Sequence, residues 1–196
     1  MPLITRKELD QIKKIKGHTI GDGLSKDREF VLKEKGKKGL KKAEDKMEEL
    51  GHPVKYKEID RNKRYPAATD ILFLLVCKRM FKWNDDKIRE WGQWGVKVHF
   101  ITKMMMKYFT SLEVLAKQAN RYWSMYYDEG EMKMEQIDKK EKNIILSFQG
   151  FKTHPVHLRY IEGVIHQAVS FVVRSDKLQV RVSPNKKEDY RINITW

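Results

Sequence analysis

The chain of 196 residues contains a single cysteine, Cys77, so an intrachain disulfide is excluded and a reducing compartment is indicated. Its strongest apolar run, Ile71–Cys77, is far shorter than the roughly 18 residues that a membrane-spanning helix needs. The N-terminus lacks the apolar core of a signal peptide. These absences predict a cytoplasmic protein with no transmembrane segment.

Motifs that carry chemistry are also missing. The sequence has no nucleophile elbow, no phosphate-binding glycine loop and no metalloprotease helix. The glycines at 17, 21 and 23 do not follow a clear strand, so they make no dinucleotide fingerprint. We therefore name no catalytic residue and favour a non-enzymatic function, with catalysis left open.

Charge is plentiful but mixed in sign. The net charge is +14, yet residues 1–50 hold 14 Lys and Arg against 10 Asp and Glu. No helix-turn-helix, RNP or zinc-finger signature accompanies the lysines. A solvated surface is the favoured interpretation, and nucleic-acid binding through the lysine-rich N-terminal 50 residues is an alternative.

The C-terminal third predicts two β-hairpins that enclose one amphipathic helix. Glu131–Ile137 and Asn143–Phe148 alternate apolar and polar residues around a polar loop, and Leu178–Val182 and Tyr190–Trp196 repeat the pattern. Between them, Pro155 suits the first turn of a helix. Its apolar stripe has spacings of three and four: Leu158, Ile161, Ile165, Ala168, Val172. This ββαββ block predicts a four-stranded antiparallel sheet covered by helices, an α+β fold.

The preceding residues are predicted to be mostly helical. A helix over Thr69–Phe81 is apolar nearly all round and should be central. Another begins at Asn84 and continues towards Phe109, and a capping box at Thr110 opens a helix that ends near Tyr127.

The first 60 residues form a separate group of predicted elements. Leu40–Leu50 is a charged helix after interruptions at Gly36 and Gly39, and Val54–Ile59 alternates like a short strand. We expect residues 1–60 to be a charged helical extension packed on an α+β domain of residues 61–196.

Three segments carry a family resemblance: Gly150–Gly163, Asp189–Trp196 and Arg121–Glu131. Over residues 65–196 the chain resembles the 4-vinyl-reductase-like domains, which belong with the haem–nitric-oxide-associated and TRAPP-subunit ligand-binding fold. The resemblance implies a small-molecule-binding or scaffolding domain that is often dimeric. It also suggests, by family name alone, a tetrapyrrole-related enzyme as a further alternative.

The same resemblance bears on cofactors. Zinc-binding members use cysteines and one acid, and the matching positions here are His157, Val180, Ser183 and Arg191, of which only His157 can ligate a metal. Haem-binding relatives have a proximal histidine and a Tyr-x-Ser-x-Arg clamp, whereas this chain offers His99 without that clamp. We therefore predict neither zinc nor haem.

On the predicted helix after Pro155, His157, His166 and Glu162 are candidates for a metal site or an acid–base unit. Helical spacing places His157 and His166 on nearly opposite faces, so they cannot share an ion, and capping and surface roles are favoured. Glu162 and His166 are i and i+4 neighbours, and a solvated pair is favoured over an acid–base unit.

The middle of the chain is rich in aromatic residues and methionine, which suit a pocket for a flat or fatty ligand. Aromatic core packing is the competing interpretation. We predict a small apolar or aromatic ligand held between the helices and the sheet of a homodimeric protein. The predicted lining residues are Trp91, Trp94, His99, Met105, Tyr122, Tyr126 and Tyr160.

Overall fold

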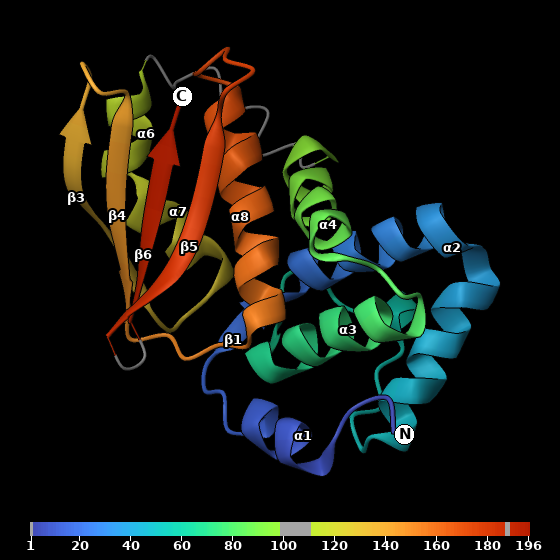
Figure 1. Ribbon diagram of the computed structural model, residues 1–196. Coiled ribbons are helices and arrows are strands. Elements are labelled where there is room, and N and C mark those ends of the chain that lie inside the picture. Colours follow the sequence, from blue (N-terminus) through green and yellow to red (C-terminus); the bar gives the residue numbers. More distant parts are fainter. Residues whose placement is uncertain (1, 99–110, 187–188) are drawn as a thin grey trace.

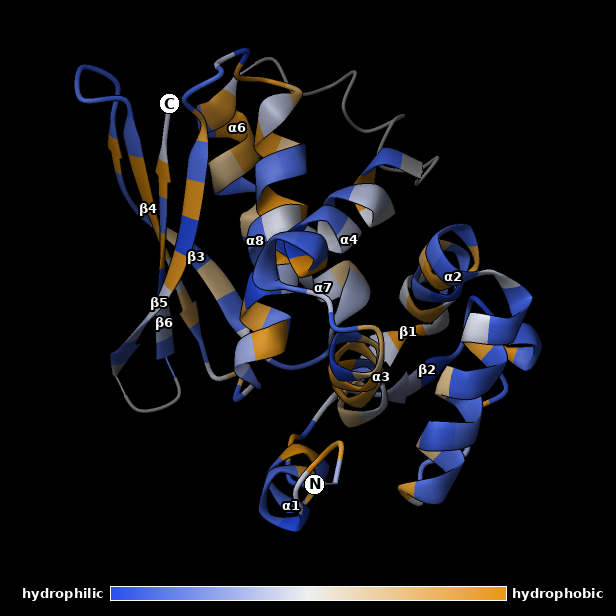
Figure 2. Cartoon of the chain, turned by 45° about the vertical axis from the view of Figure 1, so that its right-hand side comes forward, coloured by the Kyte–Doolittle hydropathy of each residue, from blue (hydrophilic) through white to orange (hydrophobic). Residues whose placement is uncertain are grey.

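The computed structural model describes residues 2–98, 111–186 and 189–196. A four-stranded antiparallel sheet stands beside a group of helices, and a two-stranded sheet lies in the N-terminal part (Figure 1). Figure 2 shows the larger sheet nearly edge-on, with the helices gathered on one side of it. The predicted α+β class is confirmed. Within the described residues, no helix is long and apolar enough to cross a membrane.

The C-terminal third builds the larger sheet. β3 (Glu131–Asp138) and β4 (Asn143–Gln149) form one hairpin, and β5 (Gln179–Lys186) and β6 (Asp189–Thr195) form the other. Helix α8 (Pro155–Ser170) joins the two hairpins, and the strand order is β3-β4-β6-β5. The predicted ββαββ order is therefore confirmed, and the two hairpins meet through the pairing of β4 with β6.

Alternation along the strands places their apolar residues on one face. Ile144, Leu146 and Phe148 of β4 are buried, as are Ile192 and Ile194 of β6. Successive side chains of a strand point to opposite faces, so these residues two apart share the face that the helices cover. This face is one wall of the protein core.

The rest of the chain is mainly helical. Its elements are α1 (Arg6–Lys13), β1 (His18–Ile20), α2 (Gly21–Glu49), η1 (Tyr56–Glu58), β2 (Arg64–Pro66), α3 (Ala67–Met80), α4 (Asp85–Val98), α6 (Leu112–Lys117) and α7 (Ala119–Tyr126). Every residue of α3 from 67 to 77 is buried, which confirms the prediction of a central helix. Leu24 and Phe30 of α2 are fully buried in the same apolar cluster. The proposed division at residue 60 stays a prediction.

Three local predictions differ from the structure. Val54–Ile59 contains the single turn η1 instead of a strand, because β1 pairs with β2 and leaves this run without a strand partner. α2 has non-helical geometry at Gly36, with φ of 65°, as predicted, but continues through Gly39. The predicted helix ending near Tyr127 is divided into α6 and α7 at Gln118.

Helices α4 and α8 cross at close range through glycines. A Cβ atom at Gly163 would overlap the carbonyl oxygen of Arg89 and lie 2.7 Å from its carbonyl carbon. A Cβ atom at Gly92 would overlap the carbonyl oxygen of Tyr160 in the same way. Only glycine permits the two backbones to approach this closely, so the pair fixes how α8 sits against the N-terminal helices.

A buried carboxylate fastens the same crossing to the sheet. Glu162 is 1% exposed and accepts hydrogen bonds from Arg89 Nε at 2.7 Å, Arg159 Nη1 at 2.6 Å and the Val182 backbone N–H at 2.8 Å. The prediction of a solvated pair between Glu162 and His166 is wrong. Helical spacing alone predicted that the face of α8 with Glu162 is exposed to solvent. In the structure α4 and β5 cover Glu162, so this side chain links α4, α8 and β5.

Candidate functional site

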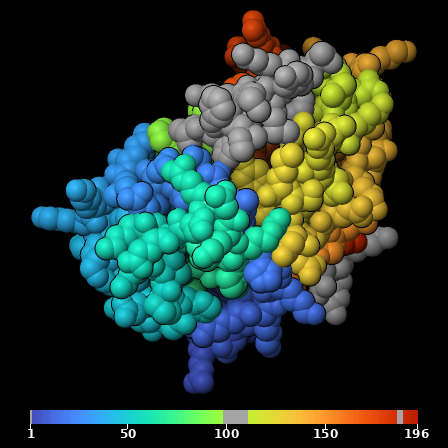
Figure 3. Space-filling model, turned by 180° about the vertical axis from the view of Figure 1, so that it is seen from behind, coloured from blue at the N-terminus to red at the C-terminus, as the bar shows by residue number. Residues whose placement is uncertain are grey.

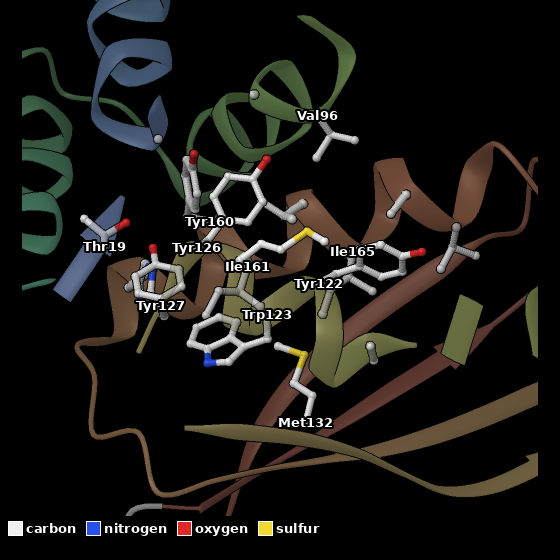
Figure 4. Close-up of a pocket in the computed structure, with 18 of the residues that line it drawn as sticks. Thr19, Val96, Tyr122, Trp123, Tyr126, Tyr127, Met132, Tyr160, Ile161 and Ile165 are labelled. Atoms are coloured by element: carbon white, nitrogen blue, oxygen red, sulfur yellow. The ribbon is translucent and has the colours of Figure 1, made fainter. Parts of the chain in front are cut away.

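A cavity of about 220 Å³ lies between the helices and the larger sheet. Its walls come from α3, α4, α6, α7 and α8, from β1, β3 and β4, and from the start of α2. Apolar side chains dominate the lining and include Leu115, Ala116, Met132, Ile161, Ile165 and Ala168. Figure 4 shows Trp123, Met132, Ile161 and Ile165 among the sticks that surround this space. The cavity therefore offers mainly an apolar surface to a ligand.

The residues after α7 bring the N-terminal part of the chain to the cavity. Tyr127 forms an isolated β-bridge with Thr19, and the Asp128 N–H donates to the His18 carbonyl oxygen at 3.3 Å. Figure 3 shows this segment (yellow) beside the N-terminal part of the chain (blue). Thr19 and Tyr127 both line the cavity and lie together at one end of it (Figure 4).

The structure brings three of the predicted lining residues to the cavity. Tyr122 and Tyr126 reach it from α7, and Tyr160 reaches it from α8. Their role in binding stays a prediction. His99 and Met105 lie outside the described residues.

The two predicted tryptophans are placed elsewhere. Trp91 is fully buried and stacks on Phe30, with ring centroids 5.1 Å apart and planes at 15°. Trp94 is half-buried, with the Lys33 ammonium 4.7 Å above its ring. Neither is among the described lining residues, so both contribute to the packing of α2 against α4.

A connected set of polar side chains closes the end of the cavity near Thr19. The Tyr127 hydroxyl donates to Asp70 Oδ2 at 2.9 Å and lies 2.9 Å from His157 Nε2. His157 Nδ1 lies 2.9 Å from Thr153 Oγ1, and the Tyr160 hydroxyl donates to Asp27 Oδ1 at 3.2 Å. We call Asp27 and Asp70 the carboxyl pair.

Proton positions in this set follow from one another. The Tyr127 hydroxyl gives its only proton to Asp70, so His157 Nε2 must donate to Tyr127 and Nδ1 must accept from Thr153. Burial, together with the nearby His154, lowers the pKa of His157 to about 3. His157 is thus a neutral, buried histidine, and the predicted surface or capping role is wrong for it. His154 caps α8, as that prediction allowed.

The carboxyl pair is deeply buried. Asp27 is 1% exposed and Asp70 is 3% exposed, and both line the cavity. Burial and the neighbouring charge of Asp70 raise the pKa of Asp27 well above its ordinary value. Burial also raises the pKa of Asp70, although hydrogen bonds from Asp27 and Tyr127 counteract this. The two carboxyl groups therefore share one proton, which is bonded to Asp27 and directed towards Asp70.

The carboxyl pair and Tyr127 were not identified from the sequence, because Asp27 lies in a charged segment and Asp70 resembles an ordinary acid at a helix start. Two signals were present. Asp27 follows Leu24 by three residues and precedes Phe30 by three, which places it on the apolar face of α2. Asp70 lies within a helix that is apolar on all sides, where no face is left for solvent. Among the described residues, no group of three or more His, Cys, Asp or Glu side chains is arranged to hold a metal ion.

Comparison with known proteins relates this geometry to one fold. No protein-family model matches the sequence, and no curated protein matches it. Among solved structures, a mutant H-NOX protein from K. algicida in the Fe(II) unliganded state has a TM-score of 0.65 and 11% identity over 90% of this chain and 95% of its own. An H-NOX protein from S. oneidensis in the Fe(II)NO ligation state has a TM-score of 0.63 and 13% identity, covering 89% of this chain and 97% of its own.

A third structure, from a study of haem distortion in the H-NOX family, has a TM-score of 0.60 and 12% identity over 90% of this chain and 94% of its own. The chain therefore has the H-NOX fold. This confirms the haem–nitric-oxide-associated fold to which the sequence resemblance pointed, whereas membership of the 4-vinyl-reductase-like domains stays a prediction. The prediction that haem is not a cofactor is corrected. It rested on the missing Tyr-x-Ser-x-Arg clamp, whereas the structures that share this fold include haem proteins.

Proposed function

We propose that the protein is a binding module for a small apolar or aromatic molecule, which it holds in the cavity between α7, α8 and the sheet. The observation that supports this most is the size and lining of the cavity. Protein interiors are packed closely, with few voids larger than a water molecule. An apolar cavity of roughly 150 Å³ is enough to bind benzene. The cavity here is about 220 Å³, so it accommodates a larger apolar ring system.

Haem is a candidate occupant that the fold comparison supplies. The apolar walls suit a flat macrocycle. Lys26 is a cation in the described lining whose ammonium lies 3.9 Å from Asp22, so it would have to leave that pair to bind a haem carboxylate. His157 also lines the cavity, but both of its ring nitrogens hold hydrogen bonds, so ligation would require one of them to break. His99 directly follows α4 in the sequence and is the other candidate ligand. When bound, haem would supply an iron that holds a gas such as NO.

Binding can be tested with two probes and a matched pair of variants on α6. Haemin and naphthylethanol are titrated separately into the purified protein, with haem absorbance and naphthyl fluorescence as readouts. Ala116 lines the cavity, whereas Val114 on the same helix is exposed. We expect saturable binding of at least one probe, weakened about tenfold or more by Ala116→Phe because the new ring occupies the cavity, and unchanged by Val114→Phe.

The proposal fails if neither probe binds saturably, or if Ala116→Phe and Val114→Phe bind the probe with the same affinity. Circular dichroism and the unfolding midpoint check that Ala116→Phe folds. If it does not, Ala168→Leu, which enlarges a lining residue of α8, replaces it.

The homodimer is a further prediction that accompanies this proposal. It is tested by analytical ultracentrifugation of the free protein and of the protein with probe. Nucleic-acid binding and a tetrapyrrole-related enzymatic activity gain no support from the comparisons.

A further inference from the structure

The carboxyl pair has no cationic partner among the described residues, although such a pair is costly to bury. No ion pair or hydrogen bond within the described ranges joins Asp27 or Asp70 to a Lys or Arg side chain. Lys26 is adjacent in sequence, but its ammonium lies 3.9 Å from Asp22. Buried charges are normally paired, and an unpaired one calls for a specific reason.

The groups that face the pair do not supply a positive charge. Burial raises the pKa values of Tyr56, Cys77, Tyr127 and Tyr160, so they remain uncharged at neutral pH. His157, which reaches the pair through Tyr127, is neutral. With one shared proton, the pair therefore keeps a negative charge that no neighbouring group compensates in the described part of the chain.

One oxygen of the pair is available for a donor. Asp70 Oδ2 accepts from Tyr127, whereas Asp70 Oδ1 is buried and has no hydrogen-bond partner in the described part of the chain. The shared proton on Asp27 is directed towards Asp70, and a carboxylate oxygen has room for a second donor. Both acids line the cavity, so a bound molecule can donate to this oxygen while the pair keeps its shared proton.

We propose that the cavity selects ligands that carry a protonated amine on an apolar body, with the amine at the carboxyl pair and the body along α7 and α8. This inference rests on the proposed function, because it assigns a ligand class to the same cavity. An ammonium group donates a charge-assisted hydrogen bond to Asp70 Oδ1 and supplies the missing positive charge. The pair keeps its shared proton when the amine binds, so its single negative charge and the positive charge of the ammonium cancel.

The apolar remainder of the cavity explains the second half of this ligand class. Beyond the carboxyl pair, the described lining consists largely of aliphatic and aromatic side chains from α6, α7 and α8. A ligand that placed its amine at the pair would bury its hydrocarbon part against these residues. Two chemical requirements, one cation and one apolar body, therefore meet in one cavity.

The test compares each amine with its neutral isostere. Naphthylethylamine and naphthylethanol, and octylamine and octanol, are titrated calorimetrically into wild-type protein and into Asp70→Asn. We expect the amine of at least one pair to bind about tenfold to a hundredfold more tightly than its alcohol, as charge-assisted hydrogen bonds do. We expect this preference to disappear in Asp70→Asn while alcohol binding stays the same. Asp10→Asn, the same change at an exposed acid of α1, should keep the preference.

A second readout needs no variant. Amine binding to wild-type protein is repeated in two buffers of different ionisation enthalpy, and the difference in heat gives the number of protons released. We expect no proton release from either ligand, because the amine enters as the ammonium and the pair keeps its proton. Release of a proton on amine binding would mean that the two charges do not cancel, and would contradict the proposed ligand class.

The outcomes separate the two proposals. If both alcohols bind as tightly as their amines, or if amine binding releases a proton, the ligand class is refuted while the binding function stands. If neither amines nor alcohols bind, the ligand class fails, and the binding function fails with it when haemin does not bind either. If Asp70→Asn does not fold, the amine preference and the absence of proton release in the wild-type protein decide.

Discussion

Replacement of Glu162 by alanine is expected to lower the free energy of unfolding by about 3–4 kcal/mol. The variant removes a buried acceptor and leaves three donors without it: Arg89, Arg159 and the buried N–H of Val182. Removal of one partner of a buried ion pair costs about 3–5 kcal/mol. The two arginine side chains are 24% and 23% exposed, so water can solvate them in part, and the lower half of that range applies.

The measurement is equilibrium unfolding in urea, monitored by circular dichroism at neutral pH. For a domain of this size, the loss corresponds to a fall in Tm of about 6–16 °C. Glu162→Gln should lose about half as much free energy, because its amide oxygen still accepts one or two of the hydrogen bonds. Glu90→Ala is the control, since Glu90 makes an exposed 2.9 Å pair with Lys87 and should cost less than about 1 kcal/mol.

The reasoning is refuted if Glu162→Ala costs no more than Glu90→Ala. That result would mean that the contact between α4, α8 and β5 depends on apolar packing alone, and that the arginines find other partners without loss.

Two further predictions concern the crossing of the helices and the buried histidine. Gly163→Ala should cost about 1–3 kcal/mol or more in urea unfolding, because its Cβ would overlap the Arg89 backbone; Gly23→Ala, where the nearest atom is 3.6 Å away, is the control and should be nearly neutral. His157 has a folded-state pKa lowered to about 3, so its contribution to stability is present above the ordinary value of 6.5 and is lost as pH falls, because the unfolded chain then binds the proton first. Between pH 7 and pH 5 the wild-type protein should therefore lose about 2 kcal/mol more than His157→Gln; equal losses in the two proteins would show that His157 is not held neutral.

The sheet and its connecting helix were predictable because their signals are local. Alternation in the strands and the three-and-four spacing after Pro155 depend only on neighbouring residues, and the structure confirms both. The same holds for α3, whose uniformly apolar sequence requires cover on every side. The run Val54–Ile59 shows the limit of such signals, because a strand also needs a partner that the run itself does not specify.

The candidate site was predictable only in part. Aromatic residues are equally suited to core and cavity, so the sequence could not separate Trp91, which stacks in the core, from Tyr160, which lines the cavity. The carboxyl pair joins residues 43 positions apart in the sequence, on α2 and α3, and Tyr127 reaches it from a further element. No short-range pattern relates these positions to one another.

The sequence by itself determined the strands of the larger sheet, the helices α3 and α8, and which of their faces are apolar, because backbone geometry imposes fixed periods on neighbouring residues. Only the tertiary structure decided that two acids, a tyrosine and a neutral histidine meet at one end of an apolar cavity. That meeting depends on how closely α4 and α8 approach, on the bridge between Thr19 and Tyr127, and on the burial that alters the protonation of each group.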